Sequence, residues 1–334
     1  MKLSTKRLSE CRKMLHNMET SKCTQTYKFE PSADVKDKLE RNAAFGELVF
    51  TKQMEATTQD RVQNEVVSGP CDKVNVKSSS DKNDCNIVGI DMLSSQELVL
   101  ADFANMTFKI VNMRDYKIIY ERKLSTPPQG LTVLNKDSVA VLLNYSVVVV
   151  KTSVNKIANE IHLRSQSYGI KNKQSNLLIS SCYPFPKLDI LNQKGEILQT
   201  ILSDPEKGLL EQPRQIAVST DGMYIYVSDY QSKNKIARLS ITGDVINVYK
   251  NENKKDEYIQ PRGIVVAKDG CVFVCDFSGN NIRMFSADLS NQRRILTEAD
   301  GIHRPYSIYF CSRENKLFVS NSTSNDILIF SLKW

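Results

Sequence analysis

The chain has 334 residues, of which 41% are hydrophobic and 25% are charged, a balance typical of soluble globular proteins. No run approaches the roughly 18 consecutive apolar residues of a membrane-spanning helix, and the basic residues 1–7 lack the apolar core of a secretory signal. The net charge of +7 is a mild excess that permits an acidic partner without requiring one. We therefore expect a cytoplasmic protein that has no membrane partner.

The eight cysteines and three histidines lack the spacing of a metal site. No C-x-x-C pair is present, and His16, His162 and His303 lie far apart in the sequence. Free buried thiols are the expected state of the cysteines in a reducing compartment. The sequence thus predicts no metal ion and no cofactor.

Residues 1–22 are predicted to form a basic amphipathic helix. Leu8, Cys11, Leu15 and Met18 recur at spacings of 3, 4 and 3, which is the a/d stripe of a coiled coil over two heptads. A stable coiled coil usually needs about three or four heptads. Two interpretations therefore stay open: a coiled-coil remnant that makes the chain a homodimer, and a helix that packs on its own domain.

Residues 23–71 are interpreted as a connector followed by a linker. Segment 32–41 has an N-cap serine and an acidic first turn, which favour a short helix, and 45–50 has the pattern of a strand. Residues 51–70 are polar and end in Ser-Gly-Pro, which is typical of a linker.

From residue 72 onward the sequence repeats a unit of short strands. The clearest copies begin with Pro-Arg-Gln-Ile-Ala-Val at 213–218 and Pro-Arg-Gly-Ile-Val-Val at 261–266, and each continues through Asp-Gly into a second apolar run that ends in Asp. The first apolar anchors of the six units, 39 to 48 residues apart, are Ile90, Leu131, Ile170, Ile216, Ile264 and Ile308. Such periods indicate an all-β protein, a six-bladed β-propeller spanning 72–334.

The last repeat offers only three strands before the chain ends at Trp334. A three-stranded final blade would leave an open sheet edge, which favours aggregation. Residues 72–77 alternate polar and apolar side chains as an outer strand does. We predict that this segment pairs with 327–330 and closes the ring.

The Pro-Arg-Gly-Ile-Val-Val run and the Asp-Gly-x-Val-Phe-Val-x-Asp run at 269–276 resemble the NHL repeat, which forms six-bladed propellers. The resemblance covers about residues 72–334 and is most specific in the fourth and fifth blades. In the sixth blade Tyr306-Ser307 replaces Arg-Gly, so that loop need not share the role of the others.

Together with the N-terminal segments, the repeats resemble the C-terminal part of a tripartite-motif (TRIM) protein of the NHL type that lacks the RING and B-box modules. Full-length members of that family are ubiquitin ligases. The resemblance implies the substrate-recognition part of such a ligase, unable by itself to recruit a ubiquitin-conjugating enzyme.

Propeller topology brings two kinds of loop to one rim of the ring, where a binding surface is expected. Aromatic and Arg side chains form hot spots in protein interfaces, and they stack on unpaired RNA bases while lysines neutralise phosphates. The residues predicted to form this surface are Arg214, Arg262, Tyr145, Tyr183, Tyr230, Lys233, Lys235 and Phe277. The alternative is structural: the aromatics pack between blades, and the Asp or Asn before each caps a turn.

These observations predict a non-enzymatic binding scaffold whose rim recognises a protein partner. The first alternative is a propeller that binds single-stranded RNA, and a lesser one is a propeller hydrolase or lyase. No G-x-S-x-G, H-E-x-x-H or Walker motif is present, so no catalytic residue is predicted.

Overall fold

The computed structural model describes residues 72–333, except 155, 203–209, 231–234 and 251–258. The predicted helix within 1–22 and the connector 23–71 lie outside these residues. No helix within the described part has the length and apolarity needed to cross a membrane.

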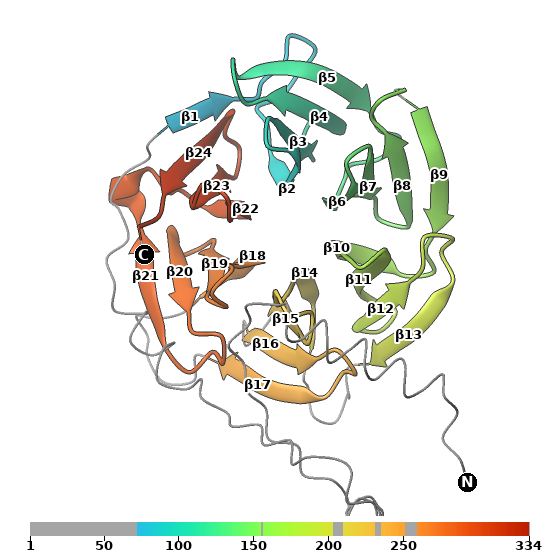
Figure 1. The fold of residues 1–334 in the computed structure, drawn as a ribbon, viewed down its shortest axis with the longest axis vertical. Helices are drawn as coiled ribbons and strands as arrows, with labels where there is room; N and C mark the ends of the chain where they lie inside the picture. The colour runs from blue at the N-terminus through green and yellow to red at the C-terminus, as the bar shows by residue number, and fades with distance from the viewer. Residues whose placement is uncertain (1–71, 155, 203–209, 231–234, 251–258, 334) are drawn as a thin grey trace, which may run out of the picture. The chain divides into compact units, whose positions relative to one another are not determined.

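Six four-stranded antiparallel sheets stand radially around one axis, so the described residues form an all-β six-bladed propeller, as expected (Figure 1). The first three sheets consist of β2 (Ile87–Ser94), β3 (Glu97–Asp102), β4 (Thr107–Asn112) and β5 (Lys117–Lys123); β6 (Gly130–Asn135), β7 (Ser138–Leu142), β8 (Ser146–Lys151) and β9 (Lys156–His162); and β10 (Gln166–Lys173), β11 (Asn176–Tyr183), β12 (Lys187–Leu191) and β13 (Ile197–Leu202). The next two consist of β14 (Pro213–Val218), β15 (Tyr224–Asp229), β16 (Lys235–Ser240) and β17 (Val245–Lys250); and β18 (Pro261–Val266), β19 (Val272–Asp276), β20 (Asn281–Phe285) and β21 (Gln292–Leu296). A single 3-10 turn, η1 (Glu298–Asp300), precedes the sixth sheet.

The sixth sheet joins the two ends of the described chain. It contains β22 (Pro305–Cys311), β23 (Lys316–Asn321), β24 (Asp326–Ser331) and, on its outer edge, β1 (Asp72–Asn75). β1 runs antiparallel to β24, with Val74 opposite Ile327. The strand ends at Asn75 rather than residue 77, and the Val76 N–H then donates to the Asn325 carbonyl at 2.7 Å.

The hydrophobic core is divided among the interfaces between neighbouring blades. Each of the six clusters of buried apolar side chains combines residues from two adjacent sheets, for example Phe273 of β19 with Phe310 of β22. Strand side chains alternate between two faces, and both faces of an inner blade strand meet a neighbouring sheet. This explains why second strands such as β7 and β19 are buried along their whole length.

The innermost strands approach each other most closely near the start of each blade. A Cβ atom at Gly169 would lie 2.0 Å from the Arg214 carbonyl oxygen of the next blade, so only glycine fits there. Ser180 Oγ donates to the same carbonyl at 2.5 Å. Gln215 occupies the equivalent position in β14, and its amide donates to the carbonyl oxygens of Gln129 and Tyr168 from the two preceding blades.

Candidate functional site

The innermost strands begin on the same rim of the ring at which the second strands end. Pro213 pairs with Asp229 in the fourth blade, and Pro261 pairs with Asp276 in the fifth. We call this edge the first rim, and the opposite edge, which carries the hairpins between first and second strands, the second rim. The residue after each inner-strand start and the residue after each second strand therefore lie near one another on the first rim.

A continuous series of alternating guanidinium groups and aromatic rings runs along the first rim from the third blade to the sixth. Arg214 Cζ lies 3.9 Å from the ring centroid of Tyr168 and 5.4 Å from that of Tyr230. Arg262 Cζ lies 4.2 Å from the same Tyr230 ring. Cation–π contacts of this kind fix the plane of a guanidinium group while leaving its N–H donors available.

The series continues beyond Arg262 into the sixth blade. Arg262 Cζ lies 5.2 Å from the ring centroid of Phe277 and 5.4 Å from that of Tyr306, and these two rings meet edge to face at 6.1 Å. Arg304 Cζ also lies 4.5 Å from the ring centroid of Phe277. We name Tyr168, Arg214, Tyr230, Arg262, Phe277, Tyr306 and Arg304 the Arg–aromatic row.

The repeat explains how the row is built. Tyr168, Arg214, Arg262 and Tyr306 each stand two residues before the apolar anchor of their blade. Tyr168 was not among the predicted site residues, and Tyr306 was expected to be a departure from the pattern. Both could have been found by aligning the six inner strands, because the shared position places all four side chains at the same height on the rim.

Two donors in the row lack an acceptor. The Nε atoms of Arg214 and Arg262 are buried, and neither has a hydrogen-bond partner. Burial and the nearby charge of Arg214 lower the pKa of Arg262, while Tyr306 and Tyr230 act in the opposite direction. Within the described residues neither guanidinium group forms an ion pair; Arg214 Nη2 donates to Gln212 Oε1 at 3.5 Å, Arg214 also bonds to Tyr168, and Arg262 bonds to Tyr230. An anion that entered this site would offset the desolvation cost of both partly buried cations.

Three further predicted residues occupy different environments. Tyr145 and Tyr183 are exposed, at 53% and 67%, and together with Phe185, at 68%, they extend the aromatic surface to the second and third blades. Lys235 is only 2% exposed, because its ammonium group pairs with Glu211 at 3.2 Å and Asp229 at 4.0 Å. The structure thus removes Lys235 from the exposed rim, and Lys233 lies outside the described residues.

The acidic residues that end the second strands serve the loops rather than a ligand. Asp229 accepts the backbone N–H groups of Glu211 and Gln212, and Asp276 accepts that of Gln260. Asp276 also pairs with the buried Arg283 at 3.1 Å. This is the structural role that was weighed as the alternative for the Asp positions.

One group of acidic and thiol side chains has the geometry of a metal site but contains its own cation. The ligand atoms of Asp81, Cys85 and Asp102 lie within 4.8 Å of one another. Lys109 Nζ lies among them, 2.5 Å from Asp81, 3.1 Å from Asp102 and 3.5 Å from Cys85 Sγ. The buried ammonium group therefore fills this cluster and offsets one of its two negative charges. Burial acts to raise the pKa of Asp102, but hydrogen bonds from Asn105 and Asn86 and the charge of Lys109 lower it overall.

Comparisons with known proteins place the fold among propellers that include enzymes. Residues 189–310 match the family model described as "Lactonase, 7-bladed beta-propeller", although six sheets are present here. No curated protein matches the chain. Virginiamycin B lyase from Staphylococcus aureus is 18% identical, with 79% of this chain and 88% of that chain covered and a TM-score of 0.54.

Two other solved structures have the same architecture. A streptogramin B lyase is 16% identical, with 79% of this chain and 87% of that chain covered and a TM-score of 0.57. The β-propeller domain of Cps50 (Swd1) from Myceliophteria thermophila is 12% identical, with 74% and 84% covered and a TM-score of 0.56. At these identities the likeness shows the fold alone.

The family match corrects one expectation from the sequence. The absence of familiar catalytic motifs led to the prediction that the chain is not an enzyme. The partial match to the lactonase family model contradicts that prediction, and functional residues that lie on separate loops need leave no short motif in the sequence.

Proposed function

We propose that the first rim binds an acidic segment of a protein partner, with carboxylate groups of the partner accepting hydrogen bonds from Arg214 and Arg262. One observation carries this proposal: two partly buried guanidinium groups share the ring of Tyr230, and their buried Nε atoms have no acceptor. A carboxylate supplies two acceptor oxygens and a negative charge, which fits a fixed guanidinium fork.

The surroundings of the two arginines suit a protein ligand. Tyr145, Tyr183 and Phe185 offer large exposed rings beside the row. Aromatic and Arg side chains clustered around a partly buried centre are the composition of interface hot spots. The sequence resemblance to NHL repeats supports a propeller of that type and, more remotely, a part in substrate recognition for ubiquitination.

Single-stranded RNA is the second ligand that this surface could accommodate. The exposed rings of Tyr145 and Tyr183 could stack on bases, and the exposed Arg164 on the same rim could contact a phosphate. The partial burial of Arg262 favours a single inserted side chain over an extended phosphate backbone, because its guanidinium group lies between three rings.

Fluorescence anisotropy with two labelled probes tests the proposal. One probe is a glutamate-rich peptide, and the other is an oligouridine RNA of similar net charge. The wild-type chain should bind the peptide more tightly than the RNA. The Arg214→Gln/Arg262→Gln variant should lose at least about tenfold in peptide affinity, the equivalent of one or two charge-assisted hydrogen bonds.

Arg294→Gln, on the exposed outer strand β21, is the matched control for a general loss of positive charge. Peptide binding that responds equally to Arg294→Gln and to the rim substitutions would refute the rim as its site. Tighter binding of the RNA, with a steep decrease as salt is raised, would instead establish the RNA interpretation.

A further inference from the structure

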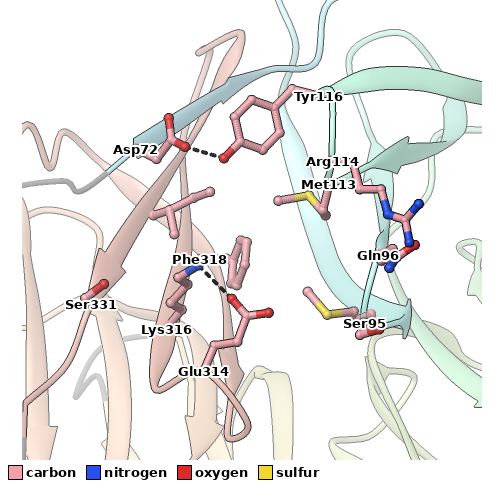
Figure 2. A pocket seen from close by; sticks show the side chains of 12 residues that line it. Asp72, Ser95, Gln96, Met113, Arg114, Tyr116, Glu314, Lys316, Phe318 and Ser331 are labelled. Atoms are coloured by element: carbon pink, nitrogen blue, oxygen red, sulfur yellow. Dashed lines mark hydrogen bonds and ion pairs between the residues drawn. The ribbon is translucent and has the colours of Figure 1, made fainter.

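A second concave site lies at the seam where the sixth blade meets the first. Its volume is about 580 Å³, within the usual range for small-molecule pockets. Figure 2 shows its two walls, one from β23 and β24 and the other from β2 and the hairpin between β4 and β5. The residues that line it on the second rim, such as Gln96 and Glu314, place it away from the Arg–aromatic row.

The seam cavity contains four apolar side chains within a lining that is otherwise polar or charged. Met92 and Met113 of the first blade and Phe318 and Ile329 of the sixth blade are these four residues. Figure 2 shows Met113 and Phe318 on opposite walls of the cavity. Phe318 and Ile329 are almost fully buried, while both methionines are partly exposed. Thioether side chains pack favourably against aromatic rings and adjust to irregular shapes. The cavity is thus suited to a flat aromatic body.

Some of the charged groups around the cavity have a partner within the protein, and one does not. Lys316 Nζ pairs with Glu314 at 2.6 Å, and Asp72 accepts a hydrogen bond from the Tyr116 hydroxyl group. That hydrogen bond lowers the pKa of Asp72, which therefore stays ionised and satisfied. Arg114 is exposed at the mouth, and its guanidinium group has no ion pair among the described residues. It is the cation that a ligand could engage.

We propose that the seam cavity binds a small aromatic carboxylate, with its ring between the two methionines and Phe318 and its carboxylate on Arg114. The ligand would contact blades one and six together. Binding would therefore stabilise the closed ring in addition to filling the cavity.

Methionine-methyl NMR on the full chain tests this site with a defined probe. The protein is labelled with ¹³C at the methionine methyl groups, and Met92→Leu and Met113→Leu identify the two reporter signals. Titration with 2-naphthoate should shift both signals to saturation. The neutral analogue 2-naphthalenemethanol should shift the same signals with at least about tenfold weaker affinity, because it lacks the charge-assisted bond to Arg114.

Arg114→Gln should reduce the affinity for 2-naphthoate to that for the alcohol and leave the affinity for the alcohol unchanged. Arg313→Gln, which removes an exposed charge from the neighbouring hairpin, should change neither. If neither methionine signal shifts, or if Arg114→Gln weakens the acid and the alcohol equally, the proposed site is wrong.

Discussion

Arg214 and Arg262 are fixed by aromatic rings on either side, whereas the neighbouring charges on the third strands are fixed by ion pairs. Lys235 and Arg283 each meet an acidic residue from the end of the second strand and are almost completely buried. The basic side chains of the propeller therefore have two different roles. A paired cation stabilises a loop, and an unpaired cation between rings keeps donors for a ligand.

Asp229 provides a pH-dependent test of this division. Burial raises its pKa to about 6, although two backbone N–H groups and Lys235 act in the opposite direction. Between its ordinary value, near 4, and pH 6 the folded state binds more protons at this carboxyl than the unfolded state does. Its contribution to the free energy of unfolding should therefore decrease as the pH rises through this window and stay constant above it.

Asp229→Asn retains an oxygen that can accept both N–H groups but removes the titration. The difference in the free energy of unfolding, wild type minus variant, should fall by about 1–3 kcal/mol between pH 4 and pH 6.5 in urea titrations. A difference that rises with pH would mean that Lys235 controls this carboxyl more strongly than burial does.

The inner strands are the elements that position the Arg–aromatic row. Their close approach requires glycine in some blades and not in others, since Gln215 occupies this position in the fourth blade. A Cβ atom at Gly169 would lie 2.0 Å from the Arg214 carbonyl oxygen, whereas one at Gly130 would have its nearest neighbour at 3.6 Å. The backbone of Arg214 is therefore held directly by the contact with β10.

Gly169→Ala should reduce the free energy of unfolding by about 1–3 kcal/mol or more, because the backbone of β14 would have to move. Gly130→Ala is the matched substitution at the equivalent position of β6 and should have little effect. Denaturant unfolding of both variants measures the difference. An equal loss of unfolding free energy in the two variants would contradict the close contact between Gly169 of β10 and the Arg214 carbonyl of β14.

Much of the fold could be predicted from these elements, and the chemistry of the rim could be predicted only in part. Hairpins with Asp-Gly turns and a regular spacing of apolar anchors predict six sheets from local patterns alone. The contact of Tyr168 with Arg214 joins neighbouring blades, and the burial of Lys235 depends on Glu211, which is distant in the sequence. Aligning the repeats could locate Tyr168 at the shared position, but its contact with Arg214 and the pairing that buries Lys235 depend on which side chains the fold brings together, so these two features needed the structure.

At the scale of the whole molecule, the ring is held closed by one short strand and one buried charge cluster. β1 forms the outer edge of the sixth blade, and Lys109 of the first blade donates to the Val76 carbonyl just after β1 at 3.0 Å. Lys109 also holds Asp81 and Asp102, and all three of these side chains are fully buried. Removing the cation would leave two buried carboxylates unpaired.

Lys109→Met should therefore lower the free energy of unfolding by about 3–5 kcal/mol. Lys117→Met, which removes an exposed lysine 3.8 Å from Asp115, should have little effect, because exposed ion pairs are weak. Urea unfolding, with hydrogen exchange of the β24 amides as a local readout, measures both. Retention of wild-type stability in Lys109→Met would show that the cluster is not needed for closure.

The claim on which the proposed function depends is that Arg214 and Arg262 keep N–H donors for an acidic ligand. Side-chain ¹⁵N NMR of the arginine Nε–H groups, recorded while the glutamate-rich peptide is added to the full chain, observes those donors directly. We predict that the Nε–H signals of Arg214 and Arg262 shift together and saturate, while that of Arg294 stays in place. Peptide binding that leaves both rim signals unchanged would contradict the account.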